Sequence, residues 1–326
     1  MSFILTEEQE ELLALVRKFS EKEILPYAHQ MDVEAHFVPG LIQKIADLGF
    51  MGINVPEEYG GVGADEVTKA LVIMEFAKYD ASVAELLAVH TLSSDIILKH
   101  GTPEQKEKYL TKACAGAVGA FALTEPNAGS DAAAAKTKAI SQGDEYIING
   151  SKCFISNMGQ DEGDYVILIV LTDPEKKTKG MSAIIVDRDT PGFTVPKTED
   201  KMGLRAAPVS ELYFDECHVP KSQLLGEEGK GFAIAMAGLD GGRIGMASQA
   251  VGLAESCIAE SVEYSTQRVQ FGKPVNANQG LQWYLADMAT KTEAAKALTL
   301  NAAALRQAGK NITKEAAMAK YYASET

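Results

Sequence analysis

The chain has 326 residues, of which 46% are hydrophobic and 23% charged, a balance typical of a soluble protein with a large core. Its length predicts about two domains or one large composite domain. The formal net charge of −14 argues against a non-specific nucleic-acid binder, because contact with phosphates requires clustered Lys and Arg. A single anionic small molecule remains compatible with this charge, since a few placed cations suffice to bind it.

No stretch approaches 18 uninterrupted apolar residues, so we expect no membrane span. The acidic N-terminus, MSFILTEEQEELL, has no basic segment ahead of an apolar one, and no secretory signal is expected. The five His are dispersed, which does not favour a metal site. The four cysteines are scattered without a CxxC pair, so we expect buried thiols in a reducing cytoplasm at Cys114, Cys153, Cys217 and Cys257.

Residues 1–115 have the apolar spacing of helices. The segment LTEEQEELLALVRKFSEKEI begins with a capping box formed by Thr6 and Gln9. The helical period continues through VPGLIQKIADLGF and EVTKALVIMEFAKYDASVAELLAVHTL. Thr102 and Pro103 then occupy the N-cap and first helical position of another segment, where proline is tolerated. This pattern predicts an N-terminal helical domain over 1–115.

The pattern changes near residue 117 to short β-branched and aromatic segments separated by Gly, Asp, Asn and Pro. These segments are AVGAFALT, EYIINGSKCFIS, DYVILIVLTD, MSAIIVDRD, GFTVPKT and ELYFDECHVP. They predict a barrel-like β domain over 116–229 with hairpin-like spacing. The helical period returns in two long stretches, which predict an antiparallel helical bundle over 230–326. The expected fold class is therefore α+β, in the order helical, β, helical.

The stretch ALTEPNAGSDAAAAKT is the first candidate functional segment. Its Pro and Gly indicate a strand that breaks into a shaped loop. Thr124 and Ser130 present hydroxyls there, and the backbone near Ala128 and Gly129 has room to approach a ligand. The alternative is a bulge and turn that needs Gly and Asp only for its geometry.

The segment SKCFISN is the second candidate, interpreted as a strand that follows the turn NGS. Alternation places Cys153 and Ile155 on one face, with Phe154 and Ser156 on the other. An aromatic ring and a hydroxyl two residues apart suit a planar cofactor with a polar edge. The simpler alternative is that Phe154 is a core residue.

Two further candidates lie in the C-terminal third. In LDGGRIG, Asp240 and Arg243 are spaced to share one helix face beside two glycines, or to form a surface ion pair. In QRVQFGKPV, Arg268 and Gln270 precede a Phe-Gly-Lys-Pro turn. A guanidinium at such a turn suits a pyrophosphate, although Arg is also favoured at helix C-termini. The sequence has neither a GxGxxG motif after a strand nor a Walker loop. The common dinucleotide-binding folds are therefore not indicated.

In this order the motifs resemble the acyl-CoA dehydrogenase family, and most closely its short-chain, butyryl-CoA-like members. The most specific of them is TEPNAGSDA. The others are LTEEQ, PEEYGG, TPEQKEKYL, NGSKCFISN, DTPGFTV, KMGLRA, FDECHVP, LLGEEGKGF, LDGGRIGMA and QRVQFGKP, which span the whole chain. The resemblance implies an FAD enzyme that oxidises the Cα–Cβ bond of an acyl-CoA thioester to the trans-2-enoyl-CoA.

The resemblance also implies roles for individual residues. It places Phe154 beside the flavin ring, where the family commonly has Trp, and Ser156 near flavin N5, where it commonly has Thr. Ser130, Asp240 and Arg243 match positions that contact CoA. The remaining flavin-lining positions are Phe121, Leu123, Thr124 and Ile155. Four further positions match residues that reach the FAD of a neighbouring subunit: Arg268, Gln270, Asn278 and Gln279. They imply an oligomer, typically a homotetramer.

The reaction implied by the resemblance needs a base for the weakly acidic α-proton, and a desolvated carboxylate suits that role. Family members carry this Glu in a C-terminal loop or, in some, at the position occupied here by Gly242. Neither is present within 1–326, so we expect a truncated chain whose catalytic Glu lies beyond Thr326. The resemblance further implies a redox partner that reoxidises the flavin, usually electron-transferring flavoprotein.

Asp95 departs from the uncharged residue that related short-chain enzymes have beside the acyl tail. The structural interpretation is an N-cap of the following helix. The functional one is a second carboxylate that acts on a branched, aryl or cyclic acyl group, in a dehydrogenase or a reductase. A third possibility belongs to another class, a non-catalytic FAD- or CoA-binding protein, which only the missing base supports.

Overall fold

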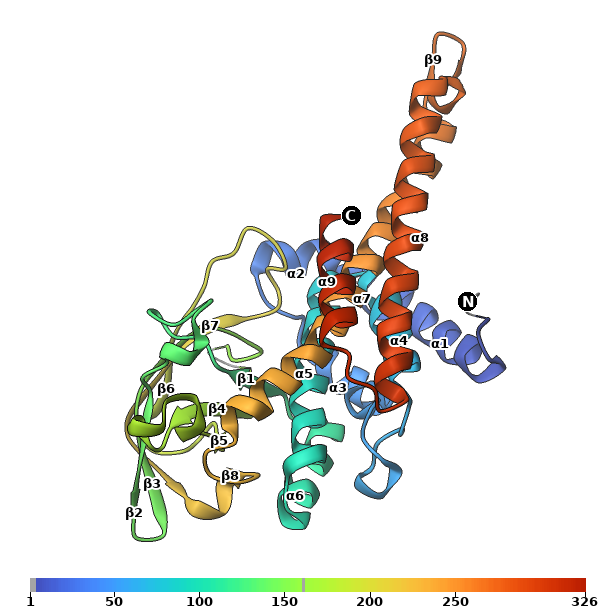
Figure 1. Cartoon of the computed structure of the whole chain (residues 1–326). Helices are drawn as coiled ribbons and strands as arrows, with labels where there is room; N and C mark the ends of the chain where they lie inside the picture. Colours follow the sequence, from blue (N-terminus) through green and yellow to red (C-terminus); the bar gives the residue numbers. More distant parts are fainter. Residues whose placement is uncertain (1–3, 160–161) are drawn as a thin grey trace. The chain divides into compact units, whose positions relative to one another are not determined.

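The computed structural model describes residues 4–159 and 162–326 (Figure 1). The chain forms two compact units whose segments interleave along the sequence. The helical unit contains the chain up to His29, Asp65–Glu85 and Asp240–Thr326. The mixed unit contains Gln30–Ala64 and Leu86–Leu239. The expected succession of helical, β and helical segments is confirmed, while the domain boundaries at 115 and 229 stay a prediction.

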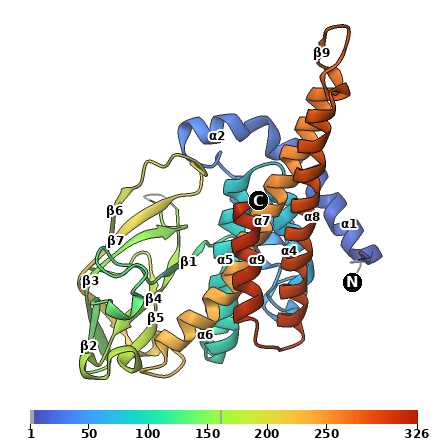
Figure 2. The same cartoon turned by 45° about the horizontal axis from the view of Figure 1, so that its top comes forward.

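Long helices make up most of the helical unit. They are α1 (Glu7–Glu23), α4 (Glu66–Ala77), most of α7 (Gly231–Gln267), α8 (Gln279–Gln307) and α9 (Thr313–Glu325). The capping box at the start of α1 is present, with reciprocal hydrogen bonds between Thr6 and Gln9. Beyond Asp240, α7 and α8 run side by side to the short hairpin of β9 (Val269–Gln270) and β10 (Lys273–Pro274) (Figures 1 and 2).

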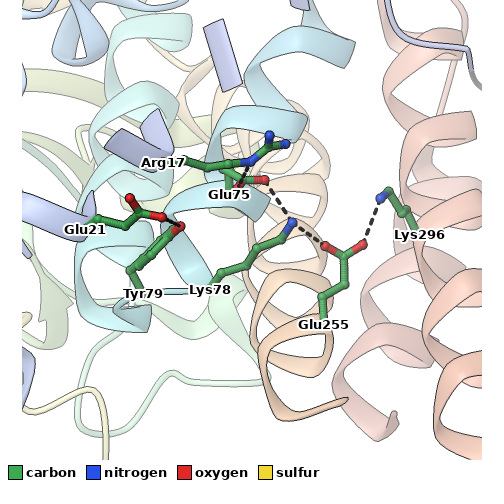
Figure 3. A network of polar contacts seen from close by, with 7 residues as sticks. All are labelled: Arg17, Glu21, Glu75, Lys78, Tyr79, Glu255 and Lys296. Atoms are coloured by element: carbon green, nitrogen blue, oxygen red, sulfur yellow. Dashed lines mark hydrogen bonds and ion pairs between the residues drawn. The ribbon is translucent and has the colours of Figure 1, made fainter. Parts of the chain in front are cut away.

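A chain of alternating charges links four helices of this unit (Figure 3). Arg17 of α1 donates to Glu75 of α4 at 2.8 Å, and Lys78, the residue that ends α4, donates to the same carboxylate at 2.9 Å. Lys78 also pairs with Glu255 of α7 at 2.8 Å, and Lys296 of α8 reaches the other oxygen of Glu255 at 2.8 Å. Burial by itself raises the pKa of Glu255, but the hydrogen bonds from Lys296 and Lys78 outweigh it and hold that pKa below its usual value.

The mixed unit is built on an eight-stranded sheet with the strand order β6-β7-β3-β2-β4-β5-β8, and β1 pairs with β4 outside this path. Most neighbours are antiparallel, whereas β1 and β2 both pair with β4 in parallel. The strands are β1 (Gly119–Ala122), β2 (Lys138–Gln142), β3 (Glu145–Ser156), β4 (Tyr165–Leu171), β5 (Met181–Asp187), β6 (Phe193–Thr198), β7 (Val209–Pro220) and β8 (Leu224–Leu225).

Helices cover one face of β4, and strands cover the other. Tyr165, Ile167 and Ile169 belong to one buried cluster, which includes residues of α5 (Ala81–His100) and α6 (Pro103–Cys114). Val166 and Leu168 belong to a second buried cluster, formed with β3 and β7. The unit also contains α3 (Leu41–Asp47) and most of α2 (Ala28–Glu34). Because both faces of β4 are buried, its sequence is continuously apolar.

The predicted turn at Asn-Gly-Ser is wrong, because β3 runs unbroken through these residues. Gly150 has φ of +147° and lies at a register shift between β3 and β7. A Cβ added to Gly150 would lie 2.7 Å from Thr137 Oγ1. The glycine therefore permits a bulge within a long strand rather than a turn between two strands.

The apolar period predicted over 66–92 belongs to two helices, α4 and α5. Asp80 separates them, because its carboxylate accepts hydrogen bonds from the backbone of Ser82 and Val83 and so begins a new helix. Of the described helices, α5 is the one whose length and hydropathy suit a membrane span, and 72% of that window is buried within the fold. Such burial is typical of a core helix.

Candidate functional site

The loop after β1 lies against the second half of β3 within the mixed unit. The backbone N–H of Cys153 donates to Thr124 O at 3.0 Å, and Lys152 Nζ donates to Leu123 O at 2.9 Å. The structure therefore brings the end of β1 next to the strand that carries Phe154. Phe121, Leu123, Thr124, Phe154, Ile155 and Ser156, the six expected flavin-lining residues of this unit, belong to these two segments.

Phe154 is not a core residue, so that alternative is wrong. Its side chain is 66% exposed, and its φ of +59° is left-handed. It lies where the register between β3 and β7 shifts, between Lys152 and Ile155. A left-handed conformation is uncommon for a bulky residue, and such residues concentrate at functional sites. The bulge turns an aromatic ring outward from an otherwise buried strand.

The predicted alternation holds from Cys153 to Ser156. Cys153 and Ile155 are buried, whereas Phe154 and Ser156 lie on the open side. Because its side chain is buried, Ile155 offers a ligand only its backbone atoms. Lys152 breaks the alternation, since its side chain is buried next to that of Cys153.

Local geometry does not account for Gly129 in the loop after β1. The loop forms a backbone bridge between Glu125 and Ala128, with hydrogen bonds of 3.2 Å and 3.0 Å. Gly129 itself has no left-handed φ, and an added Cβ would meet no atom within 4 Å. Space is therefore open beside the exposed Ser130. The backbone conformation of this loop therefore does not require a glycine at position 129, and the space beside Ser130 is accessible.

These residues fit a flavin of the kind that the resemblance implies. A planar ring system can stack on an outward-facing aromatic side chain such as Phe154. Ser156, two residues after Phe154 in β3, is half-buried and presents a hydroxyl. Thr124, just after the end of β1, is also half-buried and presents a second hydroxyl. The loop backbone at Gly129 leaves room for a second molecule next to Ser130.

Sequence reasoning missed the ion pair between Lys152 and Glu125. Lys152 Nζ lies 2.8 Å from Glu125 Oε1, and both side chains are buried. Burial raises the pKa of Glu125 by itself, but Lys152 and backbone donors outweigh it and lower that pKa below its usual value. A lysine inside the apolar segment SKCFIS is the sequence signal that indicates a buried partner.

Asp240 and Arg243 share one face of α7 in the helical unit, as predicted. Arg243 Nη1 lies 2.5 Å from Asp240 Oδ1, and Thr313 Oγ1 donates to Asp240 Oδ2 at 2.6 Å. The guanidinium is 38% exposed at its side chain, whereas the carboxylate is largely covered. Arg243 is therefore the more accessible of the two charges. Gly241 leaves room for the guanidinium of Arg306, because a Cβ at this position would collide with it.

The four residues expected to reach a neighbouring flavin lie at the tip between α7 and α8. Arg268, Gln270, Asn278 and Gln279 are all exposed. The turn between β9 and β10 has left-handed Phe271 and Gly272, with φ of +53° and +77°. Large exposed apolar side chains accompany this tip, namely Tyr264, Phe271, Trp283 and Tyr284.

Asp95 does not cap a helix, so that expectation is wrong. It lies inside α5, 7% exposed, and accepts a hydrogen bond of 2.6 Å from Asn54 Nδ2. The N-cap of the next helix is Thr102, whose capping box with Gln105 is present as predicted. Burial was also expected for all four cysteines; Cys153 and Cys217 are buried, but Cys114 is half-buried and Cys257 is exposed.

Three models of the acyl-CoA dehydrogenase family match the chain. The N-terminal domain model matches residues 6–117, the middle domain model residues 120–217 and the C-terminal domain model residues 229–326. Together they cover most of the sequence, and their order is that of the motifs.

Individual proteins are similar along the entire chain. An acryloyl-CoA reductase (NADH) of Anaerotignum propionicum is 51% identical over 328 residues, which cover 100% of this chain and 83% of that protein. The structure of butyryl-CoA dehydrogenase from Megasphaera elsdenii has a TM-score of 0.96 and 45% identity, covering 100% of this chain and 86% of that chain.

A second structure comes from work on the electron transferring flavoprotein of Acidaminococcus fermentans and flavin-based electron bifurcation. It has a TM-score of 0.97 and 45% identity, and covers 100% of this chain and 86% of that one. The family matches and these relatives agree with the motifs read from the sequence. The chain belongs to the acyl-CoA dehydrogenase family of FAD-dependent oxidoreductases.

Proposed function

We propose that this chain desaturates a short-chain acyl-CoA between Cα and Cβ, with FAD held against Phe154. The observation that carries the proposal is the outward-facing, left-handed Phe154, fixed beside the loop of Thr124 by the hydrogen bond from Cys153 N. Phe121 and Leu123 at β1 complete the apolar side of the flavin site, and Ile155 contributes backbone atoms. Bound FAD supplies the acceptor for the hydride that leaves Cβ.

The protein's part in this reaction is positioning and electrostatics. Phe154 and Ser156 orient the ring and its polar edge, and Ser130 holds the ester beside the open space at Gly129. Removal of the α-proton places negative charge on the thioester oxygen, where hydrogen-bond donors stabilise it. Arg243, paired with Asp240, offers a cation to the CoA.

Anaerobic addition of butyryl-CoA to the FAD-loaded protein tests this function. We expect the visible absorbance band of the flavin to bleach as the ester is oxidised. The measurement is an absorbance titration of the FAD-loaded protein. A protein that binds FAD but is bleached by no acyl-CoA would contradict dehydrogenation and support the non-catalytic alternative.

Gly129→Val tests the placement of the ester separately from folding. Because nothing lies within 4 Å of an added Cβ, we expect the free energy of unfolding to change by less than about 0.5 kcal/mol. The added side chain fills the space next to Ser130, so the dissociation constant for butyryl-CoA should rise by about tenfold or more, equivalent to about 1.4 kcal/mol. Calorimetry of CoA-ester binding provides the measurement.

Gly150→Val is the matched control for this substitution. There an added Cβ would collide with Thr137 at 2.7 Å, and φ is +147°. We expect this variant to lose about 2–3 kcal/mol of stability through strain and overpacking. Unchanged CoA-ester affinity in a folded Gly129→Val variant would show that the ester lies elsewhere.

We further propose that the reduced flavin passes its electrons to an electron-transferring flavoprotein. The support is the 45% identity to a chain in the structure from work on the electron transferring flavoprotein of Acidaminococcus fermentans.

We also propose a homo-oligomer that uses the tip between α7 and α8. Exposed apolar side chains such as Trp283 and Phe271 accompany Arg268 and Gln270 there, and exposed patches of this kind mark interaction sites. Sedimentation should give a mass that is a multiple of the single chain.

A second candidate function is action on a branched, aryl or cyclic acyl-CoA, in the oxidative or reductive direction. The observation that favours it is the buried carboxylate of Asp95 within α5, where Asn54 holds it at 2.6 Å. The 51% identity to an acryloyl-CoA reductase supports the reductive direction.

Asp95→Asn distinguishes the two candidates. If Asp95 acts on the acyl group, the ratio of cyclic to straight-chain activity should fall by about tenfold or more, the effect of removing one acid–base group. Flavin reduction rates with cyclohexanecarboxyl-CoA and butyryl-CoA give this ratio. A ratio equal to that of the unaltered protein would assign Asp95 a structural role only.

A further inference from the structure

We propose that Lys152 and Glu125 are positioning residues that hold the loop between β1 and β2 in the shape that receives the flavin. This inference rests on the proposed function, because it concerns the same loop. Lys152 Nζ bonds Glu125 Oε1 at 2.8 Å and Leu123 O at 2.9 Å. The side chain of Lys152 is fully buried in β3, and that of Glu125 is 9% exposed.

Glu125 closes the loop from its other end. Its Oε2 accepts the backbone N–H of Lys136 at 2.7 Å, and its Oε1 accepts that of Thr137 at 2.9 Å. Residues 126–135 therefore form an excursion whose two ends are tied to one carboxylate, and that carboxylate is tied to β3. Gly129 and Ser130 lie within this excursion.

The same ion pair connects the loop to Phe154. Lys152 lies two residues before Phe154, at the register shift that turns the aromatic ring outward. Between them, Cys153 N donates to Thr124 O. Loss of Lys152 removes its bonds to Leu123 O and Glu125, keeps the bond from Cys153 N, and leaves Glu125 as a buried charge without its cation.

Stability alone does not explain a pair of this kind. Replacing a buried ion pair by apolar residues of similar volume is often neutral or stabilising, whereas removing one partner is strongly destabilising. Besides bonding each other, the two charges supply directional bonds to three backbone groups, which an apolar pair cannot. Their role is therefore to fix where the loop backbone lies.

The test compares Lys152→Met, Glu125→Gln and the double variant Lys152→Met/Glu125→Leu. The double variant should unfold at a higher urea concentration than Lys152→Met, because it leaves no buried charge without its partner. In Lys152→Met and in the double variant, amide hydrogen exchange at Lys136 and Thr137 should accelerate by about 100-fold or more when the protein is free of FAD. The dissociation constant for FAD should rise by about tenfold or more in both.

Lys69→Met is the matched control. Lys69 is also a buried lysine, paired with Glu66 at 3.0 Å, but it lies in α4 of the helical unit. The Lys69→Met substitution should lower the free energy of unfolding. It should change neither the amide exchange at Lys136 and Thr137 nor the dissociation constant for FAD. A double variant with normal stability, normal exchange and normal FAD affinity would overturn the positioning role.

Failure of the proposed function has a separate signature. If the unaltered protein binds no FAD, the flavin proposal fails, but exchange at Lys136 and Thr137 still decides whether the ion pair holds the loop. If Lys152→Met does not fold, the double variant and Glu125→Gln provide the comparison. Slow exchange at both amides in the folded variants contradicts the inference in either case.

Discussion

The protein is expected to lose about 3 kcal/mol of stability between pH 6.5 and pH 4 through one buried histidine, His90. His90 has no exposed surface, and Gly119 N donates to its Nδ1 at 3.2 Å. Its Nε2 therefore carries the proton and donates to Met51 O at 2.9 Å. Protonation of Nδ1 would break the bond from Gly119, at the start of β1.

Burial lowers the pKa of His90 from 6.5 to about 4, against a smaller opposing effect of the Met51 hydrogen bond. Above pH 6.5 the ring is neutral in both folded and unfolded states and has no effect on the pH dependence. Between pH 6.5 and pH 4 the unfolded state binds the extra proton, so the free energy of unfolding falls by about 1.4 kcal/mol per pH unit. Below pH 4 both states are protonated and the loss stops growing.

His90→Gln checks this expectation, because the glutamine amide can still donate to Met51 O and accept from Gly119 N. Urea unfolding from pH 7 to pH 4 should show a smaller loss of stability in the variant than in the unaltered protein. The difference between the two curves isolates His90 from the carboxylates that also titrate in this range. Parallel curves would mean that His90 is protonated in the folded protein, or that the unfolded state does not take up the proton.

Phe154→Ala is expected to damage FAD binding while leaving stability within about 1 kcal/mol of the unaltered protein. Truncating a core Phe typically costs about 3–5 kcal/mol, but Phe154 is 66% exposed and has little burial to lose. Aromatic stacking contributes about 0.5–1.5 kcal/mol beyond area burial, which corresponds to a rise of up to about tenfold in the FAD dissociation constant.

Phe214→Ala provides the matched control for this effect. Phe214 lies in β7, is 3% exposed, and stacks on Phe193 with ring centroids 4.8 Å apart. Its truncation should cost about 3–5 kcal/mol. Fluorescence titration with FAD and urea unfolding are the two measurements. If the Phe154→Ala variant is strongly destabilised yet binds FAD normally, Phe154 has a structural role and does not contact the flavin.

Most of the secondary structure was predictable from the sequence, because interactions between residues a few positions apart govern it. The capping boxes at Thr6 and Thr102 each involve residues three positions apart, and both are present. The outward side of β3 followed from alternation, which placed Phe154 and Ser156 together. The two long C-terminal helices followed from their apolar period.

Features that depend on partners far apart in the sequence could be seen only in the folded chain. Asn-Gly-Ser is typical of a turn, but β7 pairs along the whole of β3 and makes Gly150 a bulge. Asp95 near the end of an apolar helix suggested a cap, whereas Asn54, 41 residues earlier in the chain, holds it inside α5. Parallel pairing of β1 with β4 likewise cannot be read from strand composition.

The candidate site shows the same division. Motifs alone identified the loop after β1 and the strand of Phe154, since both contain unusual residues in short stretches. Lys152 and Glu125 are 27 residues apart, and no local pattern indicates that they pair. Sequence spacing specifies contacts within a helix turn or between alternate strand positions, whereas a buried charge is neutralised by whichever residue the folded chain brings within about 3 Å of it.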